Sequence, residues 1–125
     1  MGAAFEVYND RGYGMAEEVY QESLEIELEL RRIPCRPKPE LCCFYKGREL
    51  KRRYIPDLVV FENLVVELKA VIQLNTEHEA QLINYLRIAR RPVGYLINFG
   101  HKDELEWKRL IFSEFISESA KISAD

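Results

Sequence analysis

The stretch "RYIPDLVVFENLVVELKA", residues 53–70, decides the fold because it reads as two apolar strands joined by a short turn. Charged side chains interrupt both strands: Asp57 in the first, and Glu67 and Lys69 in the second. A charge that is removed from water must be paired, hydrogen-bonded or bound to a metal, or else its pKa shifts until it is neutral. These three residues therefore need a structural or chemical reason for their places in the sheet.

The turn between the two strands decides whether the three charges meet. Side chains alternate along a strand, so Glu67 and Lys69 share one face of the sheet. A two-residue turn at 62–63 would set Asp57 opposite Leu68, on the other face, whereas a three-residue turn would set it opposite Lys69. A site made of all three charges thus requires an odd-numbered turn, a bulge, or a kink at the proline before Asp57.

Two interpretations of the charges stay open from spacing alone. Asp57 and Glu67 repel each other unless something lies between them, and a hard cation such as Mg²⁺ accepts one or two protein carboxylates. Lys69 would then be placed to contact a water molecule or a phosphate oxygen. In the alternative, Lys69 forms a buried salt bridge with Glu67 or Asp57, and the cluster only stabilises the fold.

Periodicity extends the interpretation to the rest of the chain. Residues 15–32 and 75–91 have apolar residues at helical spacing, and Thr76 followed by Glu79 is typical of a capping box. Strands are predicted over residues 39–45, 48–61, 64–71, 93–99 and 105–112. The order helix, three-stranded meander, helix, strand and edge strand predicts an α/β fold, with a mixed β-sheet flanked by helices and a right-handed crossover through the second helix.

Length and composition favour one soluble domain over residues 1–125, in which 113–125 form a short helix or a frayed tail. The chain is 47% hydrophobic and 31% charged, and its apolar runs are shorter than the roughly 18 residues of a membrane-spanning helix. Without an N-terminal secretory signal, the expected location is the cytoplasm. Cys35, Cys42 and Cys43 lack paired spacing, which predicts reduced thiols that pack as small hydrophobic side chains.

The net charge of −3 does not by itself indicate a nucleic-acid-binding protein, but the charge is unevenly distributed. Two basic clusters, one at 46–53 and one at the end of the second predicted helix, consist of Lys46, Arg48, Lys51, Arg52, Arg53, Arg87, Arg90 and Arg91. Local basic stripes can follow phosphates even on an acidic chain. The alternative, which charge alone favours, is a solvated hairpin tip.

Several motifs, in the same order along the chain, resemble those of a known family. They are "GMAEEVY" (14–20), "PD" (56–57), "ELK" (67–69), "HEAQLINYL" (78–86) and "LINFG" (96–100). The second and third resemble the signature of the PD-(D/E)xK nuclease superfamily, and the first resembles the G-x-x-E-x-x-Y motif of one bacterial family within it. The resemblance covers roughly residues 5–112 and implies a restriction-endonuclease-like fold.

This resemblance implies a metal site. Asp57 and Glu67, with the backbone carbonyl of Leu68, would hold Mg²⁺ or Mn²⁺ in a member of the superfamily. Lys69 would position the attacking water and offset the charge that develops in the transition state.

The two helices would supply further residues to the site. Glu17, on the first helix, would complete it through the metal or its waters, and Gln81, on the second, would orient water or the lysine. Tyr20, His78 and Tyr85 are candidates for supporting contacts around the site. For the two tyrosines the alternative is core packing, and for His78 it is a surface position.

Together these residues predict a metal-dependent phosphodiester hydrolase. A bound divalent ion lowers the pKa of water, and a lysine stabilises charge on the phosphorus. By analogy with the superfamily we expect DNA rather than RNA as the substrate, no strong sequence specificity, and a symmetric dimer that cuts two strands. The alternatives are a catalytically inert nucleic-acid- or protein-interaction domain that retains the fold, and an enzyme for another phosphate ester such as a nucleotide.

Overall fold

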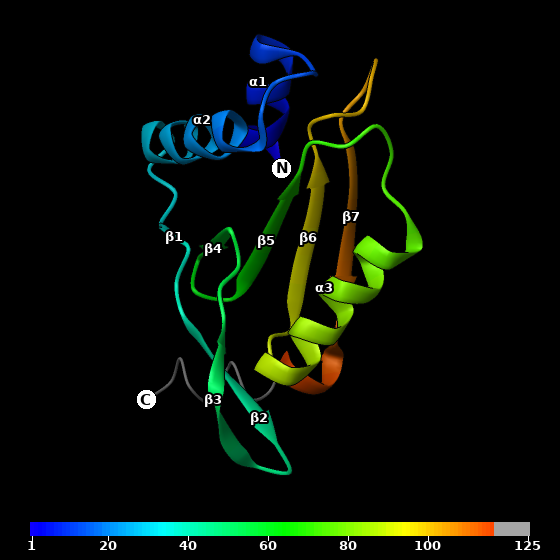
Figure 1. Ribbon diagram of the computed structural model, residues 1–125. Helices are drawn as coiled ribbons and strands as arrows, with labels where there is room; N and C mark the ends of the chain where they lie inside the picture. The colour runs from blue at the N-terminus through cyan, green and yellow to red at the C-terminus, as the bar shows by residue number, and fades with distance from the viewer. Residues whose placement is uncertain (117–125) are drawn as a thin grey trace.

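The computed structural model describes residues 1–116, which form a five-stranded sheet with helices on both faces and a separate hairpin (Figure 1). The helices are α1 (Gly2–Arg11), α2 (Glu17–Leu30), α3 (Thr76–Ala89) and the 3₁₀ helix η1 (Ser113–Phe115). The strands are β1 (Cys35–Pro37), β2 (Leu41–Tyr45), β3 (Arg48–Tyr54), β4 (Leu58–Val60), β5 (Leu64–Lys69), β6 (Val93–Asn98) and β7 (Glu106–Ile111). The predicted α/β fold with a mixed sheet between helices is confirmed.

The main sheet has the strand order β1-β4-β5-β6-β7. Its central neighbours β5 and β6 are parallel, and its other neighbours are antiparallel. A parallel pair needs a long connection, and α3 provides it, so β6 is an inner strand and β7 an edge strand as predicted. The right-handed sense of this crossover stays a prediction.

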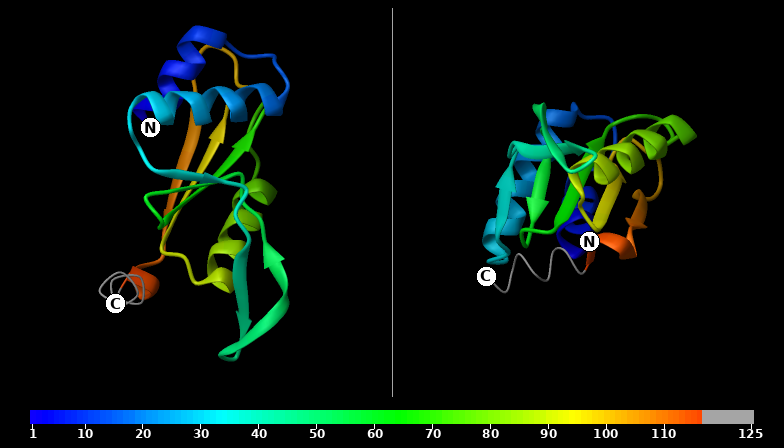
Figure 2. Two further views of the ribbon diagram at one scale, coloured as in Figure 1. Left: turned by 90° about the vertical axis from the view of Figure 1, so that its left-hand side faces the viewer. Right: turned by 90° about the horizontal axis from the view of Figure 1, so that it is seen from below.

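Alternation along the strands divides the interior into two hydrophobic cores. On one face, Leu68 packs in a cluster with Tyr20 and other residues of α1 and α2. On the opposite face, Val65 packs in a second cluster with Leu86 and other residues of α3. Figure 2 shows α2 and α3 on opposite sides of the sheet. The second interface is close because Gly94 has no side chain: a Cβ there would lie 2.7 Å from Leu86 Cδ1.

The predicted strand over 48–61 is wrong as a single element. It divides into β3 and β4 at Pro56, whose ring removes the N–H that a continuous strand would need. β3 pairs only with β2 in a two-stranded sheet of its own, and β1, which the sequence did not reveal, takes the outer place beside β4. The β2–β3 hairpin therefore extends away from the main sheet as an arm (Figure 1).

The helix starts also differ from the prediction. Helix α1 was not predicted, because its buried positions include small alanines that give a weak apolar pattern. The capping box of α3 was placed one residue too late. Asn75 accepts a hydrogen bond of 3.0 Å from His78 N, and the His78 ring accepts one of 3.1 Å from Asn75 N, so Thr76 and Glu79 are not the capping pair.

The three cysteines are free thiols, as predicted, but they do not all pack as hydrophobic side chains. Cys43 is buried and Cys35 is half-buried, whereas Cys42 is exposed. Its strand belongs to the hairpin arm, where one face meets solvent, and Arg53 Nη1 donates a hydrogen bond of 3.0 Å to its Sγ.

The end of the chain lies partly outside the described residues. The short helix predicted after residue 112 is present as η1, and residues 117–125 of the predicted tail are not described. Among residues 1–116, no helix combines the length and the apolarity that crossing a membrane requires.

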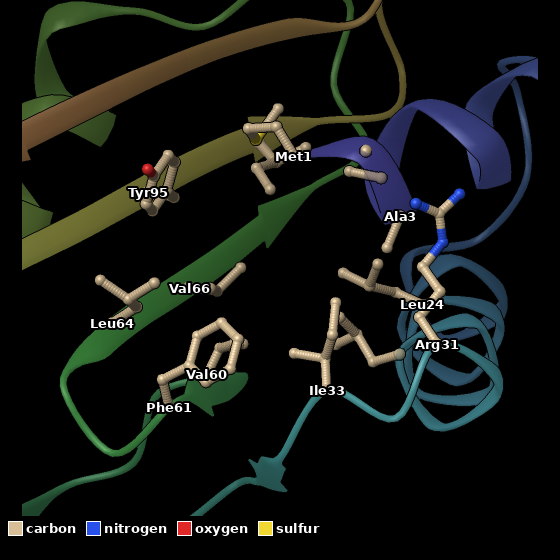
Figure 3. A pocket seen from close by; sticks show the side chains of 14 residues that line it. Met1, Ala3, Leu24, Arg31, Ile33, Val60, Phe61, Leu64, Val66 and Tyr95 are labelled. Carbon is tan, nitrogen blue, oxygen red and sulfur yellow. The ribbon is translucent and has the colours of Figure 1, made fainter.

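An apolar pocket of about 150 Å³ opens on the face of the sheet that α1 and α2 cover (Figure 3). Its walls include Met1, Leu24, Ile33, Val60, Leu64 and Tyr95, with Arg31 among the residues around it. Val60 and Leu64 are neighbours of the turn that follows β4, but Asp57, Glu67 and Lys69 do not line this pocket.

Candidate functional site

A three-residue turn, residues 61–63, joins β4 to β5. The register of the two strands, continued by one pair, places Asp57 directly opposite Glu67. Opposite residues of an antiparallel pair point to the same face, so the odd-numbered turn that the site requires is present. It begins one residue earlier than expected and therefore sets Asp57 against Glu67 instead of Lys69.

Reciprocal hydrogen bonds fix the two carboxylates. The backbone N–H of Asp57 donates to Glu67 Oε1 over 2.9 Å, and the backbone N–H of Leu68 donates to Asp57 Oδ2 over 2.7 Å. Each carboxylate thus accepts from the strand that carries the other, and each retains one oxygen that these bonds do not use. The arrangement holds two acidic groups side by side.

The pair is electrostatically unfavourable as it stands. Burial, and after it the neighbouring Asp57, together raise the pKa of Glu67 to about 7, against the opposing effects of the Asp57 backbone hydrogen bond, Lys69 and Tyr54. A divalent cation bound to both carboxylates would remove this repulsion. The donor set therefore fits a hard metal ion.

The Leu68 carbonyl is placed to be a third ligand. Along a strand, successive residues direct their N–H and C=O groups to alternate edges. The Lys69 carbonyl accepts from Phe99 N on the β6 side, and the Leu68 N–H points to the β4 side, so the Leu68 carbonyl is directed toward Asp57. No group of three or more His, Cys, Asp or Glu side chains suited to a metal occurs within residues 1–116. The candidate set is thus two carboxylates and a carbonyl.

Lys69 and Glu17 complete the charged cluster from two different elements. Lys69 shares the face of Glu67, and Glu17 begins α2 at the end of the sheet. Burial raises the pKa of Glu17, Asp57 raises it further, and Lys69 lowers it, which places Glu17 near both charges. The ion pairs found among residues 1–116 do not join Lys69 to Asp57 or Glu67, which speaks against the simple salt-bridge interpretation.

The loop before α2 explains why Gly14, Glu17 and Tyr20 are spaced as they are. Gly14 has φ +99°, a conformation that glycine adopts without strain. The Tyr20 hydroxyl donates to the Gly12 carbonyl over 2.6 Å and accepts from Met15 N over 3.1 Å, and its ring stacks on a core phenylalanine. These contacts assign Tyr20 to the core, where it holds the loop that leads to Glu17.

Gln21 is a site residue that the sequence reasoning missed. Its side chain is only 7% exposed, and its Nε2 donates a hydrogen bond of 2.8 Å to the backbone carbonyl of Asp57. Lys38 N donates to the same carbonyl over 3.0 Å. Gln21 is four residues after Glu17, so the two share a face of α2. A glutamine on the same helical face as Leu24 and Leu28 was the signal in the sequence that could have revealed it.

Helix α3 approaches the site through aromatic rings. Tyr85 stacks on Tyr54, with ring centroids 4.2 Å apart and 5° between the planes. Tyr54 was also missed; burial raises the pKa of its hydroxyl, and the adjacent Glu67 raises it further. Gln81 is exposed one turn before Tyr85. His78 belongs to the helix cap described above, where its hydrogen bonds are exposed to solvent, which agrees with the surface alternative, and a supporting contact of His78 with the site stays a prediction.

The two basic clusters meet where α3 ends against the hairpin arm. The Arg90 guanidinium lies 5.1 Å from the Phe44 ring centre, and Arg87 lies 5.7 Å from that of Phe112. Arg91 Nη1 donates a hydrogen bond of 3.2 Å to a backbone carbonyl of the turn after β4, and burial lowers its pKa. On the arm, Arg53 is paired with Glu49, while Lys46, Arg48, Lys51 and Arg52 are exposed.

Comparison with known proteins bears on the family and the fold. A family model described as the PD-(D/E)XK nuclease superfamily matches residues 1–110. A solved structure described as "Crystal structure of SSO0001" matches with a TM-score of 0.58 and 17% identity, over 86% of this chain and 55% of that one. The chain thus spans about half the length of that protein, and the likeness supports the fold alone. Curated proteins give no match. Since the family model covers most of its length, the chain belongs to the PD-(D/E)XK nuclease superfamily.

Proposed function

We propose that this chain is a metal-dependent nuclease of the G-x-x-E-x-x-Y family, which cleaves DNA rather than RNA and has no strong sequence specificity. The observation that carries the proposal is the pair of hydrogen bonds that fixes Asp57 and Glu67 side by side. A fold alone gains little from two adjacent half-buried acids, because their repulsion and desolvation oppose folding. A cation bound to both carboxylates would offset their repulsion.

The proposed ligands are Asp57, Glu67 and the backbone carbonyl of Leu68, and the proposed ion is Mg²⁺ or Mn²⁺. When bound there, the ion would polarise a phosphoryl oxygen and lower the pKa of a water molecule toward neutrality. The backbone hydrogen bonds of the two acids support this role, since they leave one oxygen of each carboxylate for the ion.

The remaining site residues would handle the water and the developing charge. Lys69 would donate to the attacking water or to a phosphoryl oxygen and offset negative charge as the phosphorus–oxygen bond breaks. Glu17 would bind water at the metal, and Gln81 would hold water with its amide, which both donates and accepts. The assignment of Glu17 is supported by its proximity to Asp57 and Lys69. The assignment of Gln81 rests on its position in α3, one turn before Tyr85.

The nucleic acid would lie along the basic side chains of the arm and the end of α3. A two-stranded ribbon is narrow enough to follow a groove or backbone of DNA. The proposed contacts are Lys46, Arg48, Lys51, Arg52, Arg53, Arg87, Arg90 and Arg91. The stacking of Arg90, at the end of α3, on Phe44 of the arm supports the closeness of the two basic clusters.

A symmetric dimer is part of the proposal, because two copies of one site would cut two strands of a duplex. A light-scattering mass equal to one chain, measured on the protein without DNA at the assay concentration, would contradict it. The free thiols favour a reducing compartment such as the cytoplasm.

Cleavage assays test the function directly. Labelled single-stranded, duplex and branched DNA, RNA, and free nucleotides are incubated with Mg²⁺, Mn²⁺ or a chelator. We expect DNA cleavage that requires metal and falls by about 100-fold or more in Lys69→Met, whereas the exposed control Lys102→Met retains it. Metal-independent binding of DNA without cleavage would instead identify the inert interaction domain, and hydrolysis of nucleotides alone would identify a different phosphate ester.

A further inference from the structure

The hydroxyl of Tyr54 is the one buried side-chain polar atom within residues 1–116 that lacks a hydrogen-bond partner. The residue ends β3 and is 4% exposed. A buried hydroxyl without a partner costs free energy, and phenylalanine would fill the same space without that cost. Packing therefore accounts for the ring and leaves the oxygen unexplained.

The position of the ring is fixed from two sides. Tyr85 of α3 stacks on it almost in parallel, and the Tyr54 ring belongs to the core beneath α3, together with Leu41 and Cys43 of the arm. Stacked aromatic rings in a packed core do not turn freely. The direction in which the hydroxyl points is thus a stable feature of the fold.

That direction leads to the candidate metal site. The hydroxyl lies close enough to the carboxyl of Glu67 for that group to raise the pKa of the hydroxyl, although the two do not meet strict hydrogen-bond geometry. Glu67 Oε1 already accepts from the backbone of Asp57. The second carboxylate oxygen of Glu67 is not used by that bond, and a carboxylate oxygen has two lone pairs, so it can accept from the hydroxyl and also bind an ion.

We infer that Tyr54 is a positioning residue of this site: its hydroxyl donates to Glu67 when the carboxylate binds a divalent ion, and Tyr85 keeps the donor in place. The inference rests on the proposed function and adds a residue to it. Donors to metal-binding carboxylates set the plane of the ligand, and their loss commonly weakens metal binding by 10- to 100-fold.

Tyr54→Phe tests the inference because it removes one oxygen and keeps the ring. We expect the metal-free variant to unfold at the same temperature as the natural protein or at a higher one. Its dissociation constant for Mn²⁺, measured by titration calorimetry, should rise about 10-fold, and cleavage should fall in parallel. If Tyr54 had only a structural role, Tyr54→Phe would change the unfolding temperature and leave the dissociation constant for Mn²⁺ as it is.

Matched variants separate the hydroxyl from the stack. Tyr85→Phe keeps the stacked ring and should bind Mn²⁺ as the natural protein does, whereas Tyr85→Ala should weaken binding. Tyr45→Phe, on the exposed part of the arm, is the control. In a double-mutant cycle, Tyr54→Phe should add little to the loss caused by Glu67→Ala, because the hydroxyl acts through that carboxylate.

The outcomes distinguish the two proposals. If the natural protein binds Mn²⁺ and cleaves DNA while Tyr54→Phe binds Mn²⁺ equally well, the role of Tyr54 is overturned and the nuclease stands. Additive losses in the cycle would overturn it as well. If the natural protein neither binds Mn²⁺ nor cleaves, the nuclease proposal fails and the role of Tyr54 fails with it.

Discussion

The backbone N–H of Asp57 donates a hydrogen bond of 2.9 Å to the carboxylate of Glu67, the residue directly opposite it in the β4–β5 register. The bond comes from the main chain, so it survives any change of the Asp57 side chain. The charge of Asp57 can therefore be removed while the position of Glu67 is retained.

Asp57→Asn separates charge from geometry. The amide oxygen of asparagine can still accept from Leu68 N, so the fold should be as stable as before or more stable, because a like charge next to Glu67 is gone. Metal-dependent cleavage should fall by about 100-fold or more, since a neutral amide is a poor Mg²⁺ ligand. Asp103→Asn is the control, as asparagine tolerates the left-handed backbone found there. Full activity in Asp57→Asn would exclude the proposed ligand.

The stability of the metal-free protein should fall as pH rises between about 4.5 and 7. The pKa of Glu67 is raised from 4.5 to about 7 in the folded protein, so in this interval the folded chain holds a proton that the unfolded chain has released. The favourable contribution is complete below pH 4.5 and is lost by pH 7, a change of roughly 3 kcal/mol. Thermal unfolding across this range measures it.

Glu67→Gln should flatten most of that pH dependence, whereas Glu104→Gln, on an exposed loop, should not. Mg²⁺ should stabilise the natural protein more at pH 8 than at pH 5, because binding requires the ionised carboxylate. Equal stabilisation at both pH values would contradict the assignment of Glu67 as a ligand.

Gln21→Leu tests the missed contact of α2. The substitution keeps the bulk of the side chain but removes the hydrogen bond to the Asp57 carbonyl, so we expect a loss of about 1–2 kcal/mol in the free energy of unfolding. Cleavage should fall by more than the loss of folded protein explains, because Asp57 loses the hydrogen bond that Gln21 donates to its backbone carbonyl. Gln73→Leu, on an exposed loop, is the matched control. If activity follows stability alone, Gln21 has only a structural role.

Charge reversal on the arm tests the nucleic-acid path. Arg52→Glu should weaken DNA binding and lower the slope of log affinity against log salt by about 1 for each phosphate contact that is lost. Arg53→Glu should have an additional cost in stability, because Arg53 is paired with Glu49. Fluorescence anisotropy at several salt concentrations measures both effects, with Arg11→Glu on α1 as the control. An unchanged slope would exclude this face.

Local patterns were sufficient to predict much of the molecule. The ranges of α2, α3, β5 and β6 follow from helical or strand periodicity, and Asp57, Glu67 and Lys69 were found because charges interrupt apolar runs. The turn could not be placed from spacing, because two-residue and three-residue versions both suit its sequence. Only the register showed that Asp57 faces Glu67.

The missed features depend on contacts between distant parts of the chain. Gln21 bonds to a residue 36 positions away, and Tyr54 gains its neighbours only when α3 folds over the sheet. The separation of the arm from the main sheet has a similar origin, because β1, which is short and unremarkable in sequence, occupies the edge that a continuous meander would have used.

The arm has a consequence for how this protein can change over evolutionary time. Its strands pair only with each other, and Pro56 separates them from the strand that follows Asp57. Residues inserted at its tip, around Lys46 and Gly47, would lengthen the reach of the molecule while every pairing in the main sheet is preserved. The appendage can thus grow or shrink in descendants of this protein without disturbing the strands that carry Asp57 and Glu67.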